Sequence, residues 1–344
     1  MEGNHFATER NSHVESINHT ANFDLVGIGN AIVDVQAPIE ASFLEEHGMV
    51  PGSMTLIDAA TAKSLYAKIH PIEQTGGGSV ANSCVAAARL GVKAAFLGKV
   101  ANDELGKKYA EDMRLSGVYC PPTLLDSQNS TESTAVCLIV ITADGQRTMN
   151  TYLGICTKFG EPDLDEALIA QSRILYLEGY LFDTEPAKKA FYKAAEIAHK
   201  AGRKVALSLS DSFCVERHRQ DFRALVSGHI DLLFANENEI CSLYETSNFE
   251  DAANAVNQET DFAVLTRSEK GSLILCKGER TAIEPLPVKV VDTTGAGDAY
   301  AAGFLSGFLK GRPLKECGFL GSRAASEVIS HFGPRLSSSF SEMA

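Results

Sequence analysis

Residues 292–298 are Asp-Thr-Thr-Gly-Ala-Gly-Asp, and they continue without a break into AYAAGFLSGFL, residues 299–309. The apolar run 288–291 ahead of this segment predicts a strand, and the run after it predicts a helix over about 295–310. Glycines at the start of a helix let a ligand approach the backbone closely, where N–H groups and the helix dipole attract negative charge. The segment therefore predicts an anion-binding helix N-terminus.

A carboxylate, Asp298, stands at the start of that predicted helix. It would repel a phosphate if it were only structural. It suits a general base that removes a hydroxyl proton while neighbouring N–H groups take up charge on a transferring phosphoryl group. The alternative is a tight turn whose acidic residue only favours the helix dipole, but the flanking Asp292 and Thr293 favour catalysis. The candidate catalytic residues are Asp298, Gly295, Ala296 and Gly297.

A second glycine cluster, Gly76-Gly77-Gly78, precedes Ser79 and Asn82 at the start of another predicted helix. The backbone can lie against a polar ligand here, and Asn82, one turn into the helix, can bond a hydroxyl group. The alternative is a flexible hinge followed by a serine N-cap.

A third candidate site follows the first predicted strand, where Asn30 and Asp34 come after Gly27 and Gly29. Ligands of open α/β sheets bind at the carboxyl ends of the strands. A carboxylate and an amide at that edge suit the recognition of neighbouring hydroxyl groups, and the alternative is a solvated turn.

Short apolar runs alternate with helical periods along most of the chain, which is typical of a parallel sheet covered by helices. The predicted strands are 25–28, 94–97, 174–177, 205–208, 232–235 and 263–266. The predicted helices are 79–90, 103–116, 185–201, 295–310 and 313–331. Because the strands are continuous apolar runs, we expect burial on both faces. The fold class is therefore α/β, with a doubly wound, mostly parallel central sheet flanked by helices.

Two segments depart from this rhythm and predict a small β lid. Residues 134–141 and 147–153 alternate around a turn at 143–145, as in a β-hairpin. Residues 31–57 run extended around one short helix, 41–47. A sheet with one open face needs a cover, which a substrate or a partner subunit would supply. We expect a flexible tail over 1–22 and one domain over 23–344, with the lid built from parts of 31–57 and 134–153.

Composition narrows the function classes. The 344 residues are 44% hydrophobic and 22% charged, as in an ordinary globular enzyme. The net charge of −13 argues against a nucleic-acid binder.

Walker A and H-E-x-x-H motifs are absent, and the dinucleotide fingerprint fails because Ile32 stands where its third glycine belongs. Gly76-x-Gly78-x-x-Ala81 has the fingerprint's spacing, but residues 73–75 before it do not predict a strand.

The eight cysteines are widely spaced and contain no C-x-x-C pair, which favours reduced thiols and a cytoplasmic location. The sequence has no apolar run of 18 or more residues, so we expect no membrane association.

Gly77-Gly78-Ser79-x-x-Asn82 and DTTGAGDA, residues 292–299, together resemble the two signatures of the ribokinase-like (PfkB) carbohydrate and nucleoside kinases. The resemblance extends from about residue 24 to 334. Within that family, the segments 29–34 and 207–213 are most similar to adenosine kinases. Ser208 replaces an asparagine common in eukaryotic relatives, which leaves the base specificity open.

The resemblance implies sites for ATP and Mg²⁺. Asn236-x-x-Glu239 is similar to the family's N-x-x-E element, which organises Mg²⁺ and phosphate, so Glu239 would act on the ion indirectly. The strand-to-turn segment 266–271 is similar to a nucleotide-contacting element, although Ser268 replaces its middle glycine. A K⁺ site is raised by the family likeness alone and has no motif behind it. The implied ATP and phosphate residues are Arg147, Asn236, Thr266, Gly271, Asp292 and Thr293.

The resemblance also implies a nucleoside pocket. Asp34 and Asn82 would bind ribose hydroxyls, and Tyr180 would offer an apolar wall to the base. Leu181 stands where the family resemblance implies an aromatic residue. The implied acceptor residues are Asn30, Asp34, Gly78, Ser79, Asn82 and Tyr180.

We therefore expect ATP-dependent phosphorylation of a nucleoside 5′-hydroxyl, with adenosine converted to AMP in purine salvage. Asp298 would be the base, and the protein would be a monomer or homodimer. The alternatives are an inosine/guanosine kinase, a sugar kinase of the same family, or a non-catalytic nucleoside-binding homologue. The presence of Asp298 and Glu239 argues against the last of these.

Overall fold

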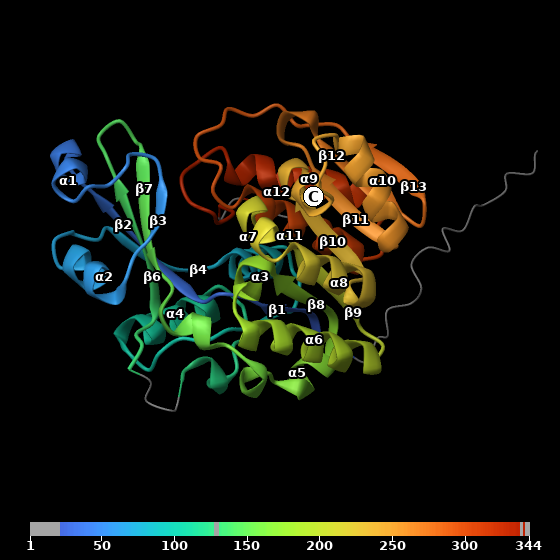
Figure 1. The fold of residues 1–344 in the computed structure, drawn as a ribbon, viewed down its shortest axis with the longest axis horizontal. Helices are drawn as coiled ribbons and strands as arrows, with labels where there is room; N and C mark the ends of the chain where they lie inside the picture. Colours follow the sequence, from blue (N-terminus) through green and yellow to red (C-terminus); the bar gives the residue numbers. More distant parts are fainter. Residues whose placement is uncertain (1–20, 127–130, 338–339, 341–344) are drawn as a thin grey trace, which may run out of the picture.

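The computed structural model describes residues 21–126, 131–337 and 340. Its larger sheet has eight strands (Figure 1). In spatial order they are β13 (Glu279–Ile283), β12 (Ser272–Cys276), β11 (Phe262–Thr266), β10 (Leu232–Asn236), β9 (Lys204–Ser208), β8 (Ser172–Glu178), β1 (Phe23–Ile28) and β5 (Ala94–Leu97). The block from β11 to β5 is parallel, and β12 and β13 add antiparallel pairs. The mostly parallel sheet is confirmed, and all six predicted strands lie in it.

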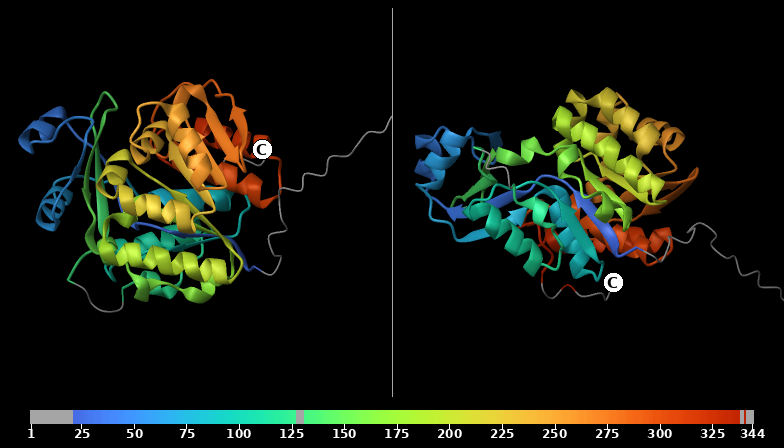
Figure 2. Two further views of the ribbon diagram at one scale, coloured as in Figure 1. Left: turned by 45° about the vertical axis from the view of Figure 1, so that its right-hand side comes forward. Right: turned by 90° about the horizontal axis from the view of Figure 1, so that it is seen from below.

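Helices cover both faces of this sheet, as the apolar runs predicted. Successive residues of one strand belong to opposite cores, with Leu25 in one and Val26 in the other. One face carries α3 (Ser79–Arg89), α11 (Ala296–Leu309) and α12 (Leu314–Val328). The other carries α5 (Glu166–Ala170), α6 (Glu185–Lys200), α7 (Ser212–Arg217), α8 (Arg219–His229), α9 (Glu237–Leu243) and α10 (Phe249–Glu259). Figure 2 shows the sheet between these two helix layers.

Helix α11 lies in the centre of its layer. Nearly every side chain from Ala299 to Leu309 is buried, which explains why the segment is apolar on all sides. The ring of Phe304 packs edge-on against Phe234 and Phe262 of the sheet, with ring centroids 5.7 and 5.9 Å apart. This packing fixes the N-terminus of α11, and with it Asp298, relative to the carboxyl ends of the strands.

The smaller sheet stands beside the main body (Figure 1). Its order is β3 (Met54–Leu56), β7 (Arg147–Tyr152), β6 (Ala135–Ile141), β2 (Ile32–Pro38) and β4 (Glu73–Gly77). Helices α1 (Ala41–Glu46) and α2 (Ala59–Tyr66) lie on the side away from the main body, and α4 (Glu104–Leu115) packs against β4. Short 3₁₀ turns complete the connections: η1 (Pro122–Leu124), η2 (Gly154–Lys158), η3 (Glu161–Asp163), η4 (Gly179–Asp183) and η5 (Ser268–Lys270). The second sheet and its hairpin are confirmed.

Two sequence predictions about strands are wrong. Residues 73–75, which carry no strand pattern, belong to β4, because the strand is held by its pairing with β2 rather than by apolar side chains of its own. Residues 288–291 form no strand, since no neighbouring strand pairs with them, and Val290 and Val291 are exposed. The strand β4 belongs to the small sheet and runs antiparallel to β2, so the dinucleotide fingerprint still lacks its parallel βαβ unit. The predicted tail, 1–22, lies outside the described residues except for its last two.

Candidate active site

The residues predicted to form an anion hole lie in the first turn of α11. Gly295, the N-cap, has a φ of 76°, and a Cβ there would lie 2.6 Å from Pro334, so the position requires glycine. A Cβ on Gly297 would meet no atom within 4 Å, so the space beside it is open. Among the residues described, the backbone N–H groups of Gly297 and Asp298 have no acceptor. These free donors and the dipole of a 14-residue helix suit a phosphate group.

Asp298 joins the two glycine motifs, which lie more than 200 residues apart. The Ser79 hydroxyl donates to its Oδ1 at 2.6 Å, and the Asn82 amide donates to its Oδ2 at 3.2 Å. The Ser83 hydroxyl also donates to its backbone carbonyl at 3.0 Å. Burial raises the pKa of Asp298 to about 6, against the lowering effect of the bonds from Ser79 and Asn82. A carboxylate with a pKa of about 6 is mostly ionised at neutral pH. Because this pKa is close to neutral pH, the group can also accept a proton during the reaction.

Asp34 projects from β2 of the small sheet, and glycines make room for it. A Cβ on Gly77 would lie 2.4 Å from its Oδ2, so glycine is needed for the carboxylate to lie there. Burial raises the pKa of Asp34 to about 7, although the charges of Arg147 and Arg335 lower it. The neighbouring Gly78 has a φ of 109°. The glycine cluster thus allows close packing against Asp34, which is the small-sheet carboxylate predicted to bind an acceptor hydroxyl.

Glu178, at the carboxyl end of β8, is a central residue that the sequence prediction missed. It is buried, and it accepts hydrogen bonds from Asn30 N at 3.1 Å, Asn30 Nδ2 at 2.8 Å and Val80 N at 2.9 Å. Burial raises the pKa of Glu178 to about 7, against these three hydrogen bonds. Glu178 therefore ties Asn30 to the N-terminus of α3. The sequence signal that could have identified Glu178 is an acidic residue directly after the apolar predicted strand 174–177.

Asn236 and Glu239 form a capping box at the N-terminus of α9. Asn236 donates from its N to Glu239 Oε2 at 2.9 Å and from its Nδ2 to Oε1 at 2.5 Å, and it accepts from Glu239 N at 2.9 Å. Burial raises the pKa of Glu239 to about 7, and the charges of Asp211 and Asp298 raise it further. Because Asn236 engages both oxygens, a Mg²⁺ role for Glu239 fits best through water.

The donor set fits a magnesium ion that arrives with a nucleotide. Among the described residues, no three His, Cys, Asp or Glu side chains cluster into a metal site. Mg²⁺ in kinases takes most of its ligands from phosphates and water, with one or two carboxylates. Glu239, whose two oxygens are engaged by Asn236, would act on the water ligands of such an ion.

Arg147, at the start of β7, reaches across to the anion hole. Its Nη1 pairs with Asp292 Oδ2, which also accepts from Gly333 N at 3.1 Å. Its Nε and Nη2 are buried and have no partner among the described residues. The hydroxyl of Thr294 donates to Asp292 at 2.7 Å, whereas Thr293 is exposed. Burial raises the pKa of Asp292. The hydrogen bonds from Thr294 and Gly333 and the charge of Arg147 outweigh burial and hold this pKa below its usual value.

The implied nucleotide segment lies further along the same edge. Thr266 ends β11 directly beside Asn236 in the strand register. A Cβ on Gly271 would come 2.0 Å from the carbonyl of Ile283, so this glycine is required by the hairpin itself. Ser268 has a φ of 49°, the left-handed region that explains why a glycine is expected there.

Two aromatic side chains stand exposed near the acidic residues. Tyr180 in η4 is 42% exposed, and Phe213 at the start of α7 is 68% exposed. Burial of the hydroxyl raises the pKa of Tyr180, and the charges of Asp211, Glu239 and Asp298 raise it further. Exposed aromatic rings beside a polar site are available to a planar ligand. Phe213 ends the segment 207–213 that resembles adenosine kinases. Because its ring is exposed, it is a further candidate for contact with a ligand.

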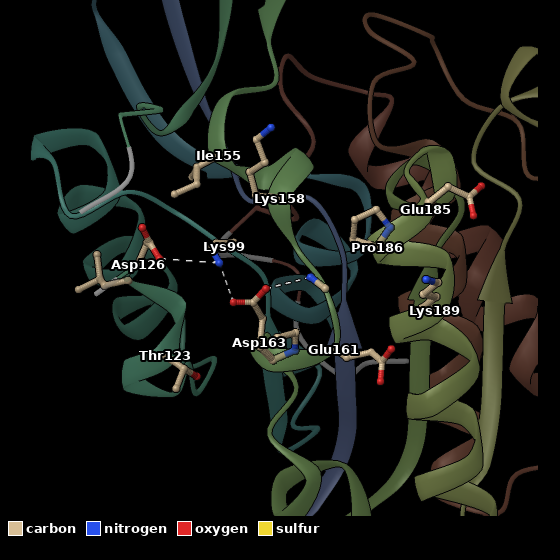
Figure 3. Close-up of a pocket in the computed structure, with 13 residues that line it drawn as sticks. Lys99, Thr123, Asp126, Ile155, Lys158, Glu161, Asp163, Glu185, Pro186 and Lys189 are labelled. Carbon is tan, nitrogen blue, oxygen red and sulfur yellow. Dashed lines mark hydrogen bonds and ion pairs between the residues drawn. The ribbon is translucent and has the colours of Figure 1, made fainter. Parts of the chain in front are cut away.

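A cavity of about 750 Å³ lies away from these residues (Figure 3). It is lined by Lys99, Asp126, Asp163 and the start of α6. Lys99 is already paired, at 2.8 Å from Asp163 and 3.7 Å from Asp126. The cavity contains none of the predicted site residues, and it is not the candidate active site.

Several known proteins that resemble this chain are kinases. The model of the pfkB family of carbohydrate kinases matches residues 49–340. The chain is similar to the adenosine kinase of Sinorhizobium meliloti (45% identity, TM-score 0.82) and to a probable sugar kinase of Rhizobium etli (42%, 0.82); each match covers 92% of this chain and 96% of the other. It is also 27% identical to 5-dehydro-2-deoxygluconokinase of Bacillus subtilis, over 92% of both chains. No helix in the described residues is long and apolar enough to span a membrane.

Proposed function

Since this chain belongs to the pfkB family of carbohydrate kinases, we propose that it transfers the γ-phosphoryl group of ATP to the 5′-hydroxyl of a nucleoside, with adenosine preferred. The observation that carries the proposal is the position of Asp298, which lies at the anion hole and is held by Ser79 and Asn82 of the other glycine motif.

The residues divide the reaction between them. Asp298 takes the proton from the acceptor hydroxyl as its oxygen attacks phosphorus and the bond to ADP breaks. The free N–H groups of Gly297 and Asp298 stabilise charge on the transferring group. Arg147 offers its two unpartnered donors to phosphate oxygens. Mg²⁺, when bound, neutralises charge on the ATP phosphates, and Glu239 would orient its water ligands.

The small sheet would act as a lid. It carries Asp34 for the acceptor and Arg147 for the phosphates, and Arg147 already pairs with Asp292 beside the anion hole. Closure excludes water, which would otherwise accept the phosphoryl group.

A nucleoside acceptor is supported by two features. Tyr180 and Phe213 expose aromatic surface where a base can pack. The identity to an adenosine kinase is 45%, against 42% to a probable sugar kinase and 27% to the 5-dehydro-2-deoxygluconokinase. The second candidate function is a sugar kinase, which is favoured by the names of several curated relatives.

An acceptor panel tests the proposal. ADP formation would be followed with adenosine, inosine, guanosine, cytidine, ribose and 5-dehydro-2-deoxygluconate, and the product identified by mass spectrometry. We expect the highest kcat/KM with adenosine and a 5′-monophosphate product. Higher kcat/KM with a sugar would overturn the nucleoside assignment. Thermal stabilisation by adenosine without any ADP formation would indicate a non-catalytic binder.

Asp34→Asn should weaken acceptor binding. The amide keeps the shape but loses the charged acceptor of the hydroxyl bonds, so we expect KM for the nucleoside to rise roughly ten- to hundredfold, with KM for ATP little changed. The matched control is Glu45→Gln, an exposed carboxylate on α1 at the outer side of the same sheet. Equal acceptor KM values in both variants would remove Asp34 from the acceptor site.

The pH dependence should show an acidic limb near pH 6. The base acts only when ionised, and the pKa of Asp298 is about 6. We therefore expect kcat, measured at saturating ATP and acceptor, to fall as the pH drops through about 6, because protonated Asp298 cannot accept the hydroxyl proton. The measurement is a pH profile of kcat in a constant-ionic-strength buffer. A rate independent of pH down to 5 would contradict the assigned base.

A further inference from the structure

The C-terminal loop, residues 331–337, packs against both glycine motifs. Pro334 lies against Gly295 at the anion hole. Gly333 N donates to Asp292 at 3.1 Å, on the same oxygen that binds Arg147 of the small sheet. This loop lies beyond both sequence signatures, and no residue in it was predicted to belong to the site.

Arg335 extends from this loop to the base of the small sheet. Its Nη1 donates to the Ser116 hydroxyl at 2.8 Å, and its Nη2 donates to Asp112 Oδ2 at 2.6 Å and to the backbone carbonyl of Gly76. Asp112 Oδ2 also accepts from Gly76 N at 2.9 Å. The arginine is 19% exposed, so these bonds are largely shielded from water.

These bonds hold both polar backbone groups of Gly76, at the junction between β4 and α3. The next residue, Gly77, lies against Asp34, and Gly78 turns the chain with a φ of 109°. Helix α3 then begins at Ser79, the residue that bonds Asp298. A shift of Gly76 would therefore move the acceptor groove and the partner of the base together.

We propose that Arg335 is a positioning residue for phosphoryl transfer, which fixes the junction of β4 and α3 and thereby aligns Asp34 with Asp298. The inference rests on the proposed kinase reaction but not on the identity of the acceptor. Misplacing reacting groups by about 1 Å can lower a rate on the order of 10²-fold. Two hydrogen bonds hold Gly76, and two more fix Arg335 to Ser116 and Asp112, so this network is a reasonable means of control.

The charge of Arg335 adds a signature that packing alone would not give. The charged groups that face Asp34 are Arg147 from β7, Arg335 from the loop, Asp298 from α11 and Glu73 from β4. The two arginines lower the pKa of Asp34, and burial and the two acids raise it. Removal of the Arg335 charge should therefore raise this pKa and move the acidic limb of acceptor binding to higher pH.

Two variants separate the clamp from the charge. Arg335→Gln loses both, so we expect the acceptor KM to rise about tenfold, the ATP KM to change less, and the acidic limb of kcat/KM for the acceptor to move to higher pH. Arg335→Lys keeps the charge but cannot bridge the same acceptors. We expect a raised acceptor KM with the acidic limb in its wild-type position. The acceptor is whichever compound the wild-type protein phosphorylates best, so failure of the adenosine assignment leaves this test intact.

The control is Arg114→Gln, an exposed arginine of α4 whose ion pair with Glu111 lies close in sequence to Asp112. A second measurement is hydrogen exchange of the ligand-free protein, in which residues 73–82 should exchange faster in both Arg335 variants than in wild type or the control. If Arg335→Gln does not fold, Arg335→Lys and the exchange data decide. Unchanged acceptor KM and unchanged exchange in Arg335→Lys would overturn the proposal, as would equal effects in Arg114→Gln.

Discussion

Asp298→Asn should lower kcat by about 10²- to 10⁴-fold, the usual cost of removing a general base. The amide has nearly the shape of the carboxylate but cannot accept the hydroxyl proton. We expect both KM values to change much less than kcat, because the N–H groups of the anion hole and Asp34 remain. The measurement is steady-state kinetics with ATP and the best acceptor, and turnover near the wild-type value would contradict the assignment.

The same substitution should not lower stability. The pKa of Asp298 is raised in the folded protein to about 6, from 3.8. A carboxyl whose pKa is higher in the folded state favours folding when protonated, and this contribution is lost as the pH rises through about 6. At pH 7 the ionised group is a burden on the fold, so the Tm of Asp298→Asn should equal or exceed that of wild type. The control is Glu196→Gln, a surface carboxylate paired with Lys200 on α6, which should leave kcat unchanged.

Gly297→Val should reduce kcat/KM for ATP on the order of 10²-fold, similar to the loss of an oxyanion-hole donor. A Cβ at this position meets no atom within 4 Å, so we expect the fold to tolerate the substitution. The added methyl groups occupy the space beside the free N–H groups, where the phosphoryl group has to lie. The Tm should be close to that of the matched control, and the loss should appear in ATP binding or turnover.

The matched control is Gly228→Val on α8, where a Cβ also meets nothing within 4 Å. It makes the same glycine-to-valine change within a helix but has no neighbouring anion hole, so its activity should match wild type. Equal activity in the two variants would place the phosphate elsewhere.

Gly295→Ala, in contrast, should destabilise the protein, because φ is 76° and Pro334 blocks the Cβ.

Local patterns were sufficient to predict the large sheet and to propose the anion hole. The six predicted strands are continuous apolar runs, a signal of burial on both faces that depends only on neighbouring residues. The glycines at 295 and 297 act through the backbone of their own helix, so their spacing carried the information. The strand β4 was missed because its residues have no pattern of their own, and Gly76 is held by Asp112 and Arg335 from distant segments.

The sequence by itself determined the fold class, the family and the residue that bears the proposed base, because each depends on short segments whose residues act together. Only the tertiary structure decided which groups surround that base. Ser79 and Asn82 reach Asp298 from over 200 residues away, Glu178 joins Asn30 to α3, and Arg335 clamps the β4–α3 junction. Contacts of this kind come from how the two sheets and α11 pack, and packing between distant segments leaves no periodic trace in the sequence.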